Sequence, residues 1–239
     1  MIDCYGLTHV GQVRSKNEDS FASVNELGFH VVADGMGGAQ AGERASQIVV
    51  QTMVAEMKRA GESATVDTMA EAIQLANRNI RWEAEQNPSL RGMGTTVVAV
   101  IVKSGIAYAV SVGDSRVYLR TGGELYCLTT DHSWVNEVGR GLGLTDKQLK
   151  THPFRNVLTK AVGSEESVSV DKIEIEFAEG DTLMLCSDGL HGVAGETALA
   201  KALNEHAGIK EQAGALIEAS LERGAPDNVT VVLIRNTDN

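Results

Sequence analysis

The spacing of apolar residues changes several times along this chain, and each change marks a different kind of element. Over residues 42–59 and 66–85 the apolar positions recur every three or four residues, which predicts two amphipathic helices. Over residues 95–128 they form short β-branched runs separated by turns that contain glycine, which predicts consecutive strands. The same patterns predict further strands over 29–33, 172–177, 182–186 and 229–234, and further helices over 196–206 and 209–222.

The connections between these strands indicate how the strands pair. Lys103-Ser104-Gly105 and Gly122-Gly123 are far too short for a parallel crossover, so the strands must be antiparallel. This number of strands favours two packed sheets with the helices outside. We therefore expect an α+β fold (α-β-β-α), a sandwich of two antiparallel β-sheets flanked on both faces by α-helices. No linker or repeat interrupts the pattern, so we expect residues 1–239 to form a single domain.

One segment does not follow these patterns. Residues 133–152 are mostly polar, contain Gly139-Arg140-Gly141-Leu142-Gly143, and include only one short helical piece over 146–150. Irregular segments of this length are commonly functional loops or lids. We interpret this segment as a flap inserted between strands.

The balance of charges restricts the partners of the protein. Its 239 residues include 21 Lys and Arg against 32 Asp and Glu, a formal net charge of −11. Nucleic acid and anionic membranes both bind basic surfaces, so neither is expected as a partner. A phosphate-bearing substrate would be repelled by the overall charge and would need a local positive centre.

The cysteines and the N-terminal residues exclude several other classes. Cys4, Cys127 and Cys186 are far apart and form no C-x-x-C pair, so neither a zinc site nor a disulfide framework is expected. Cys186 lies in an apolar run and is expected to be a core thiol. The first residues lack the basic and apolar parts of a signal peptide, and no apolar stretch approaches membrane-spanning length. We therefore expect a cytoplasmic protein.

Short acidic motifs recur from one end of the chain to the other. Each places a carboxylate beside a Gly, an Asn or another acid near an apolar run: Asn17-Glu18-Asp19, Asp34-Gly35-Met36-Gly37-Gly38, Gly113-Asp114-Ser115-Arg116, Ser187-Asp188-Gly189 and Asp227-Asn228. Carboxylate and carbonyl oxygens are the ligands that Mg²⁺ and Mn²⁺ prefer. Each acid alone could be solvated or cap an ordinary turn. Their repetition indicates instead that the rim of one sheet collects Asp34, Asp114, Asp188 and Asp227 as a metal site.

In order and spacing, these motifs resemble those of one enzyme family. The resemblance runs nearly end to end and rests on Arg14-Ser15-Lys16-Asn17-Glu18-Asp19, Ala33-Asp34-Gly35-Met36-Gly37-Gly38, Met93-Gly94-Thr95-Thr96, Val112-Gly113-Asp114-Ser115-Arg116-Val117-Tyr118, Thr129-Thr130-Asp131-His132-Ser133, Asn156-Val157-Leu158-Thr159-Lys160-Ala161-Val162-Gly163, Cys186-Ser187-Asp188-Gly189-Leu190 and Gly224-Ala225-Pro226-Asp227-Asn228-Val229-Thr230. The chain resembles the metal-dependent Ser/Thr protein phosphatases of the 2C type (the PPM family) in their compact bacterial form.

The resemblance implies a role for each acid. Asp34 would bridge two Mn²⁺ or Mg²⁺ ions, the Gly35 carbonyl would bind one of them, and Asp188 with Asp227 would bind the other. Asp114 with Asp188 would hold a possible third, weaker ion.

The same resemblance implies how the remaining site residues act. Asp19 and Glu18 would act through metal-bound waters, and Arg14 would bind the phosphate, for which its planar guanidinium is suited. The reaction would be hydrolysis of phosphoserine and phosphothreonine monoesters by direct attack of a hydroxide that bridges the two metals. The flap would lie near the substrate.

The implied enzyme is a protein-serine/threonine phosphatase, a monomer that acts on the phosphorylated products of a bacterial Ser/Thr kinase. One alternative is a catalytically weak relative that binds phosphoproteins as a regulator. Loss of metal-binding acids would mark that case, yet every core carboxylate is present. The other alternative is a cation-binding protein without catalysis, for which the spacing of an EF-hand loop is missing.

The identity of the general acid stays open. Many relatives carry a His within or just after the Asp-Gly-x-Gly-Gly turn, and Met36 and Ala39 occupy those places here. A metal-bound water or another His could protonate the leaving group instead. His132 is the nearest candidate by motif, although it, His152 and His191 are interpreted as structural.

Overall fold

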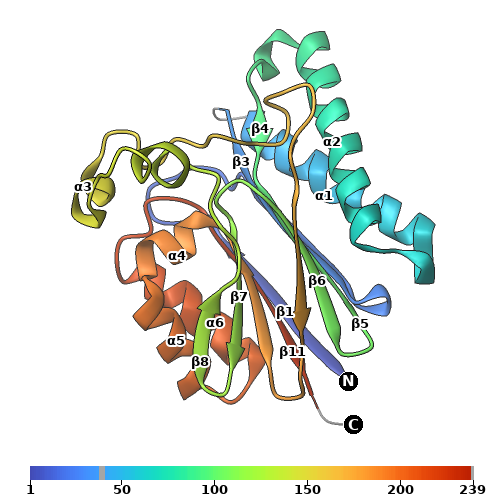
Figure 1. Cartoon of the computed structure of the whole chain (residues 1–239), viewed down its shortest axis with the longest axis vertical. Helices are drawn as coiled ribbons and strands as arrows, with labels where there is room; N and C mark the ends of the chain where they lie inside the picture. The colour runs from blue at the N-terminus through green and yellow to red at the C-terminus, as the bar shows by residue number, and fades with distance from the viewer. Residues whose placement is uncertain (38–40, 238–239) are drawn as a thin grey trace.

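Strand pairing arranges the chain into two antiparallel sheets (Figure 1). The computed structural model describes residues 1–37 and 41–237. The first sheet contains, in spatial order, β1 (Ile2–His9), β11 (Val229–Asn236), β10 (Thr182–Cys186), β7 (Arg116–Thr121) and β8 (Glu124–Cys127). The second contains β2 (Asp19–Val24), β3 (Phe29–Met36), β5 (Val97–Lys103), β6 (Ile106–Val112) and β9 (Asp171–Glu176), and the short β4 (Gly94–Thr95) pairs with the end of β3.

Helices cover the outer face of each sheet. Buried side chains of α1 (Ala41–Ala60) and α2 (Val66–Gln86) pack with those of β3 and β5 on the second sheet. Those of α4 (Asp188–Ala194), α5 (Glu196–Glu205) and α6 (Ile209–Leu221) pack on β10 and β11 of the first. Residues from both sheets, such as Val98 and Leu185, form a third core between them. The layers follow the order α-β-β-α, which confirms the predicted fold class.

The remaining helices are short. Three single 3₁₀ turns lie at the ends of strands or longer helices: η1 (Asn25–Leu27), η2 (Gly61–Ser63) and η3 (Pro88–Leu90). A π-helical turn, η4 (Val135–Gly139), and α3 (Asp146–Thr151) belong to the flap. Within the described ranges, no helix combines the length and the apolar character that crossing a bilayer requires.

The amphipathic periodicity locates the main helices and strands well. The predicted helices over 42–59 and 66–85 are α1 and α2, and α2 begins at a capping box in which the Thr65 hydroxyl accepts from the Thr68 N–H. The predicted strands over 172–177, 182–186 and 229–234 are β9, β10 and β11. Besides the 3₁₀ turns and η4, three elements were not predicted. The strands β1 and β2 are mostly half-exposed and carry a weak pattern, and α4 is only seven residues long.

Two details of the predicted strands are wrong. The strand that begins at Phe29 does not end in a turn at Asp34 but continues through Gly35 to Met36, because β4 pairs with its last residues. The apolar run over 95–102 is not one strand, since β4 ends at Thr95 and β5 begins at Val97.

The prediction that the acids share the rim of one sheet is also wrong. Asp34 belongs to β3 of the second sheet, whereas Asp188 and Asp227 flank β10 and β11 of the first. Asp114 lies in the crossover between β6 and β7, which are strands of different sheets. Face-to-face packing brings strand ends of both sheets together at one end of the sandwich. The predicted cluster therefore forms across the two sheets.

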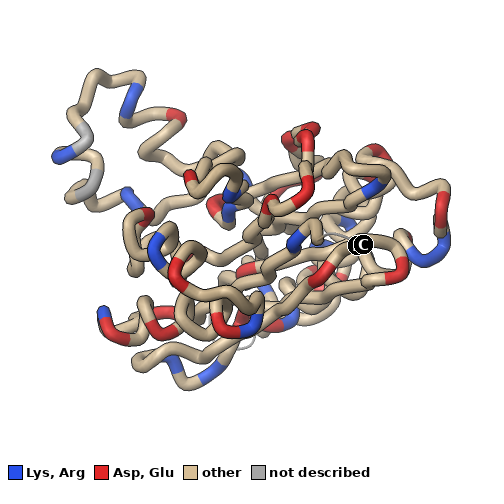
Figure 2. Tube along the Cα trace, turned by 90° about the horizontal axis from the view of Figure 1, so that it is seen from below, with Lys and Arg blue, Asp and Glu red and all other residues tan. Residues whose placement is uncertain are grey.

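The flap projects from that end of the sandwich, as both views of the chain show (Figures 1 and 2). Its helix α3 confirms the predicted helical piece, and the helical turn η4 was not predicted. The Trp134 and His152 rings stack with centroids 4.3 Å apart, and the edge of Phe154 packs against both. The flap therefore has a small aromatic core of its own.

Candidate active site

A pocket of about 600 Å³ opens at the end of the sandwich beneath the flap. Both sheets contribute to it, and so do the loop before β2 and the segment after the flap. Its lining includes Arg14, Ser15, Lys16, Glu18, Asp34, Gly35, Met36, Gly37, Thr96, Asp114, Asn156, Val157, Leu158, Asp188 and Asp227. Most of the predicted site residues are therefore in one place. Of the described ones only Asp19 is absent from the lining, because it lies buried behind it.

Backbone contacts fix the position of Asp34. Its N–H donates to the Thr96 hydroxyl (3.0 Å), and its carbonyl accepts from the Thr95 hydroxyl (2.8 Å) and the Thr96 N–H (2.9 Å). The next residue, Gly35, allows α1 to approach closely, since a Cβ there would lie 2.0 Å from the carbonyl oxygen of Gly42. Glycine is therefore required at this position.

Asn228 joins the two loops that carry the other acids. Its side-chain amide donates to the carbonyls of Val10 and Lys16 (both 2.8 Å), and its Oδ1 accepts from the Glu18 N–H (2.8 Å). Its own carbonyl approaches Gly189 so closely that a Cβ there would lie 1.9 Å away. Asn228 therefore holds the loop before β2 and the start of α4 against the beginning of β11.

Asp19 is held from the opposite sheet. Its Oδ2 accepts from the Ser187 hydroxyl (2.8 Å) and the Thr230 hydroxyl (2.6 Å). Its Oδ1 is buried and has no hydrogen-bond partner among the described residues. A buried carboxylate oxygen without a partner is costly, so this side of Asp19 is suited to a cation or to water bound to one.

The acids strongly disfavour one another's charge. Burial and then the neighbouring carboxylates, Asp19 first, raise the pKa of Asp34 well above its ordinary value. The pKa values of Asp19 and Asp114 rise to about 7, chiefly through burial. Burial and Asp227 raise that of Asp188, although a hydrogen bond with Asp34 opposes them. Such clustered carboxyl groups mark a site that needs a positive charge to be ionised at neutral pH.

A hard divalent cation fits this donor set. The candidate ligands are all carboxylate or carbonyl oxygens, the chemistry that Mg²⁺ and Mn²⁺ prefer. Among residues 1–37 and 41–237, no three His, Cys, Asp or Glu side chains already converge on one point. The raised pKa values and the unpaired oxygen of Asp19 nevertheless indicate that added positive charge would stabilise the group.

Arg14 lies on the pocket wall with its side chain half exposed. Its Nη2 donates to Asp227 Oδ2 at 2.7 Å, and this bond raises the pKa of the guanidinium. A metal ion on Asp227 would compete with that bond. Arg14 is thus beside the predicted site, and its present partner is one of the predicted ligands.

The histidines occupy structural positions, and within the described residues none lines the pocket. The buried His132 accepts from the Gly113 N–H through Nδ1 (3.1 Å), and its Nε2 lies 3.2 Å from Asp171. Nε2 of His191 bonds to the carbonyl of Asp114 (2.9 Å), and burial, reinforced by Arg116, lowers the pKa of this His to about 4. His152 packs in the aromatic core of the flap. Met36 lines the pocket, and Ala39 lies outside the described residues.

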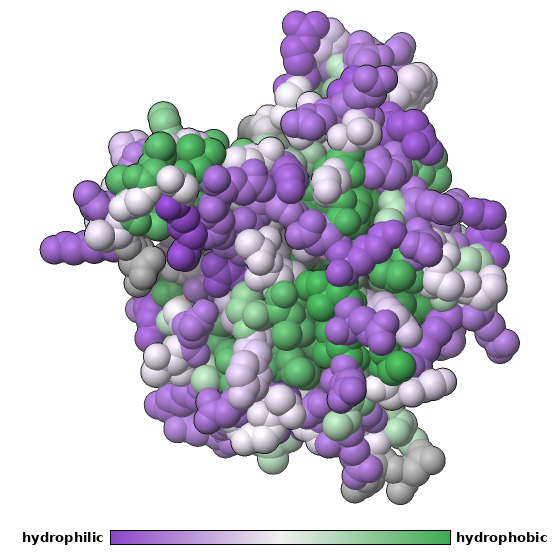
Figure 3. Space-filling model, in the orientation of Figure 1, coloured by the Kyte–Doolittle hydropathy of each residue, from purple (hydrophilic) through white to green (hydrophobic). Residues whose placement is uncertain are grey.

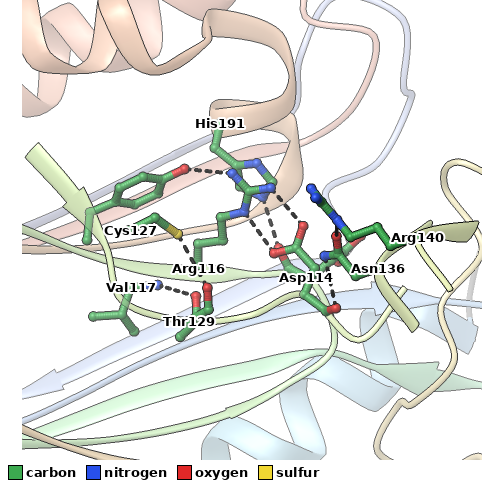
Figure 4. A network of polar contacts seen from close by, with 10 residues as sticks. Asp114, Arg116, Val117, Cys127, Thr129, Asn136, Arg140 and His191 are labelled. Atoms are coloured by element: carbon green, nitrogen blue, oxygen red, sulfur yellow. Dashed lines mark hydrogen bonds and ion pairs between the residues drawn. The ribbon is translucent and has the colours of Figure 1, made fainter. Parts of the chain in front are cut away.

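A polar network behind Asp114 links the site to the flap (Figure 4). The Arg116 guanidinium donates to both carboxylate oxygens of Asp131 (2.8 and 2.7 Å) and to the Tyr118 hydroxyl (2.9 Å). Asn136 of the flap donates to the Asp131 carbonyl, and Arg140 donates to Asn136. In the sequence, Arg116 and Asp131 were recognised only as parts of family motifs, and their pairing was not predicted. Sequence reasoning also missed Asn228 and Thr96 as supporting residues, because their partners are distant in sequence.

Comparisons with known proteins agree with this geometry. The family model described as Protein phosphatase 2C matches residues 6–224. The chain is 36% identical over 234 residues to the serine/threonine phosphatase stp of Listeria monocytogenes serovar 1/2a, covering 95% of this chain and 93% of that protein. The S. agalactiae serine/threonine phosphatase structure aligns with a TM-score of 0.92 and 32% identity over 100% of both chains. The catalytic domain of the phosphatase PstP, solved with 2 manganese ions, aligns with a TM-score of 0.87 and 31% identity over 99% of both chains.

The fold, the acidic pocket and these matches define a class, the bacterial metal-dependent phosphatases of the PPM type. The chain belongs to the protein phosphatase 2C family and is a serine/threonine protein phosphatase. The resemblance seen in the sequence motifs is thereby confirmed.

Proposed function

We propose that this enzyme removes phosphate from phosphoserine and phosphothreonine in proteins with two Mn²⁺ or Mg²⁺ ions in the acidic pocket. The observation that carries the proposal is that half-buried carboxylates, whose pKa values are raised, gather next to Arg14 in one open pocket. Relatives named as serine/threonine phosphatases, one of them solved with 2 manganese ions, support it.

Each acid has a distinct part in this proposal. Asp34 is near enough to the other four Asp side chains for each of them to raise its pKa, so it would bridge both ions, with the Gly35 carbonyl as a further ligand of one. Asp188 and Asp227 would hold the other ion. Asp114 together with Asp188 would hold a third ion, bound more weakly. Asp19 is buried outside the pocket lining and Glu18 is part of the lining, and both would act through water.

The reaction follows from this arrangement. Ions held by these residues would lower the pKa of a bound water and so supply a hydroxide for direct attack on phosphorus, while the bond from phosphorus to the Ser or Thr oxygen breaks and that oxygen takes up a proton from water. Arg14 exchanges Asp227 for the substrate and grips two phosphate oxygens, which stabilises the charge that spreads over them. The carboxylates of Asp34 and Asp188 would remain ionised, because the positive charge of bound cations would offset the repulsion between them. No cysteine nucleophile is needed, and Cys186 is buried in the core with its pKa raised.

We also propose that residues 1–239 act as one catalytic domain and as a monomer that reverses the action of a Ser/Thr kinase. Lys and Arg are interspersed with Asp and Glu along the chain rather than gathered on one face (Figure 2). Together with the net charge of −11, this distribution supports phosphoproteins rather than nucleic acid or membranes as partners.

Metal addition and ligand substitution test the proposal. After chelation, the protein should hydrolyse a phosphoserine peptide only when Mn²⁺ or Mg²⁺ is restored, and Asp34→Asn and Asp188→Asn should each lower kcat/KM by at least about 1,000-fold. The control Asp67→Asn removes an exposed acid that pairs with Lys172 outside the site and should keep full activity. A metal-independent rate, or normal activity in both ligand variants, would contradict the two-metal mechanism. Tight peptide binding without turnover would indicate the regulator instead.

A further inference from the structure

The two walls of the catalytic pocket differ in chemistry. One wall consists of the loop that carries Arg14 and Lys16, both with exposed side chains. Another part of the lining, the apolar wall, consists of Met36 at the end of β3 together with Val157 and Leu158 after the flap. The cationic wall suits the phosphate and the charges around it. The apolar wall needs another explanation, because a phosphate group gains nothing from it.

The apolar wall is exposed although it is firmly built. Met36 is 38% exposed and Val157 is 45% exposed. The Val157 N–H donates to the Phe154 carbonyl (3.0 Å), and its carbonyl accepts from the Trp134 N–H (2.8 Å). Leu158 pairs with Ser133 in a β-bridge. A side chain whose backbone is held on both sides, and which still faces open space in a pocket, is available for a ligand.

Hydrophobic surface is also exposed over the flap (Figure 3). Val138 and Leu142 are exposed apolar residues of the flap, and Phe154 just after the flap is exposed as well. Isolated exposed apolar side chains are ordinary, so the exposed ones that line the pocket itself are the informative ones.

The size of the pocket identifies what the wall contacts. A volume of about 600 Å³ is in the range of sites that enclose drug-sized ligands, which is much larger than one phosphorylated side chain. The extra room therefore accommodates residues on either side of the phosphorylated one.

We propose that Met36 and Val157 form a specificity surface that selects phosphopeptides with a large apolar residue next to the phosphoserine or phosphothreonine. This inference rests on the proposed function and assigns the substrate class of the same pocket. Burial of the neighbouring side chain against the wall adds binding free energy that a polar neighbour cannot supply.

Matched phosphopeptides test this surface. Three seven-residue phosphoserine peptides would differ only in the neighbours of the phosphoserine: Ser on both sides, Leu before it, or Leu after it. We expect the wild-type enzyme to prefer at least one Leu peptide over the Ser peptide by about tenfold in kcat/KM. Val157→Asn and Met36→Gln should reduce that ratio to about two or less.

Ratios within one variant cancel any change in the amount of folded enzyme. The control Leu142→Asn alters a flap residue that is 66% exposed and outside the pocket, so it should keep the wild-type preference. Equal rates on all three peptides, or an unchanged preference in both wall variants, would overturn the specificity surface while leaving the phosphatase reaction intact. Failure to hydrolyse any of them with Mn²⁺ would instead count against the proposed function.

Discussion

At the scale of single residues, the site opposes the stability of the fold. Asp19, Asp34, Asp114 and Asp188 are carboxyl groups whose raised pKa values show that their ionised forms are disfavoured in the metal-free protein. Each unit by which burial raises a pKa corresponds to about 1.4 kcal/mol of destabilisation once the group is ionised. Function requires these charges, and a bound cation is what makes them tolerable.

Asp114→Asn should therefore stabilise the metal-free enzyme in a pH-dependent way. The pKa of Asp114 rises from 3.8 to about 7 on folding, so the unfolded state loses this proton first. The resulting penalty is absent below pH 4, grows as the pH rises, and is complete above about pH 7. We expect the Tm of the variant in chelator to exceed that of the wild type by about 5 °C or more at pH 8, and by clearly less at pH 5.5.

Thermal unfolding with and without Mn²⁺ checks this expectation. Comparison at each pH cancels the opposite contribution of His30 and His191, whose lowered pKa values destabilise the fold as the pH falls. Added Mn²⁺ should remove the advantage of the variant. An advantage of equal size at both pH values would show that it does not come from ionisation of Asp114.

At the scale of elements, the crossover from β6 to β7 depends on one buried histidine. His132 makes two hydrogen bonds with Gly113. Its backbone N–H donates to the Gly113 carbonyl (2.9 Å), and its ring Nδ1 accepts from the Gly113 N–H (3.1 Å). Because Nδ1 accepts, the proton of the neutral ring lies on Nε2, facing Asp171 of β9. One side chain thus ties the loop that carries Asp114 to the edge of its sheet.

Substitution of His132 should show which of its contacts matters. His132→Ala leaves the buried Gly113 N–H without an acceptor and opens a cavity, so we expect a loss of about 2–4 kcal/mol in urea unfolding. In His132→Asn, the amide oxygen can replace Nδ1, so about half of that loss should be recovered. If the Asn variant is as unstable as the Ala variant, the hydrogen bond to Gly113 is not what makes His132 important.

The elements also show how far sequence reasoning reaches. The helices α1 and α2 could be located because one face of each is apolar at helical spacing and packs on a sheet. The strand β1 could not, because its side chains are only half-buried and its pairing with β11 lies at the other end of the chain. The role of Asn228 was equally hidden, since it binds Glu18 across 210 positions of sequence.

At the scale of the whole molecule, the acids were identified in the sequence but their arrangement was not. A strand followed by an acid can be read from local pattern, but which sheet the strand joins depends on pairing between distant segments. The link at Asp114 is as short as a hairpin turn, yet it passes from the second sheet to the first. Only the topology shows that the pocket is where the two sheets meet.

The hydroxyl of Thr230 makes one of the hydrogen bonds that join the two sheets beside the pocket. It donates to Asp19 of β2 (2.6 Å) from β11 of the other sheet, and it contacts the Thr8 hydroxyl (2.7 Å). Thr230→Val keeps the shape of the side chain but leaves Asp19 with fewer donors, so we expect a loss of about 1–3 kcal/mol in metal-free urea unfolding. Thr8→Val is the control: it keeps the bond to Asp19 and gives up only the contact with Thr230 and an exposed bond from Asn17, so it should lose less than half as much. Equal losses would place the effect elsewhere.

The position of β11 has a consequence for the biosynthesis of the enzyme. This strand lies between β1 and β10 in the sheet, although it is translated after both of them. A ribosome adds about 5–20 residues per second, so β1 exists for many seconds before its partner does. Asp227 lies two residues before β11 and shares this delay. The nascent chain can therefore neither close its first sheet nor complete its catalytic centre, and dephosphorylation must wait until translation has passed the final strand.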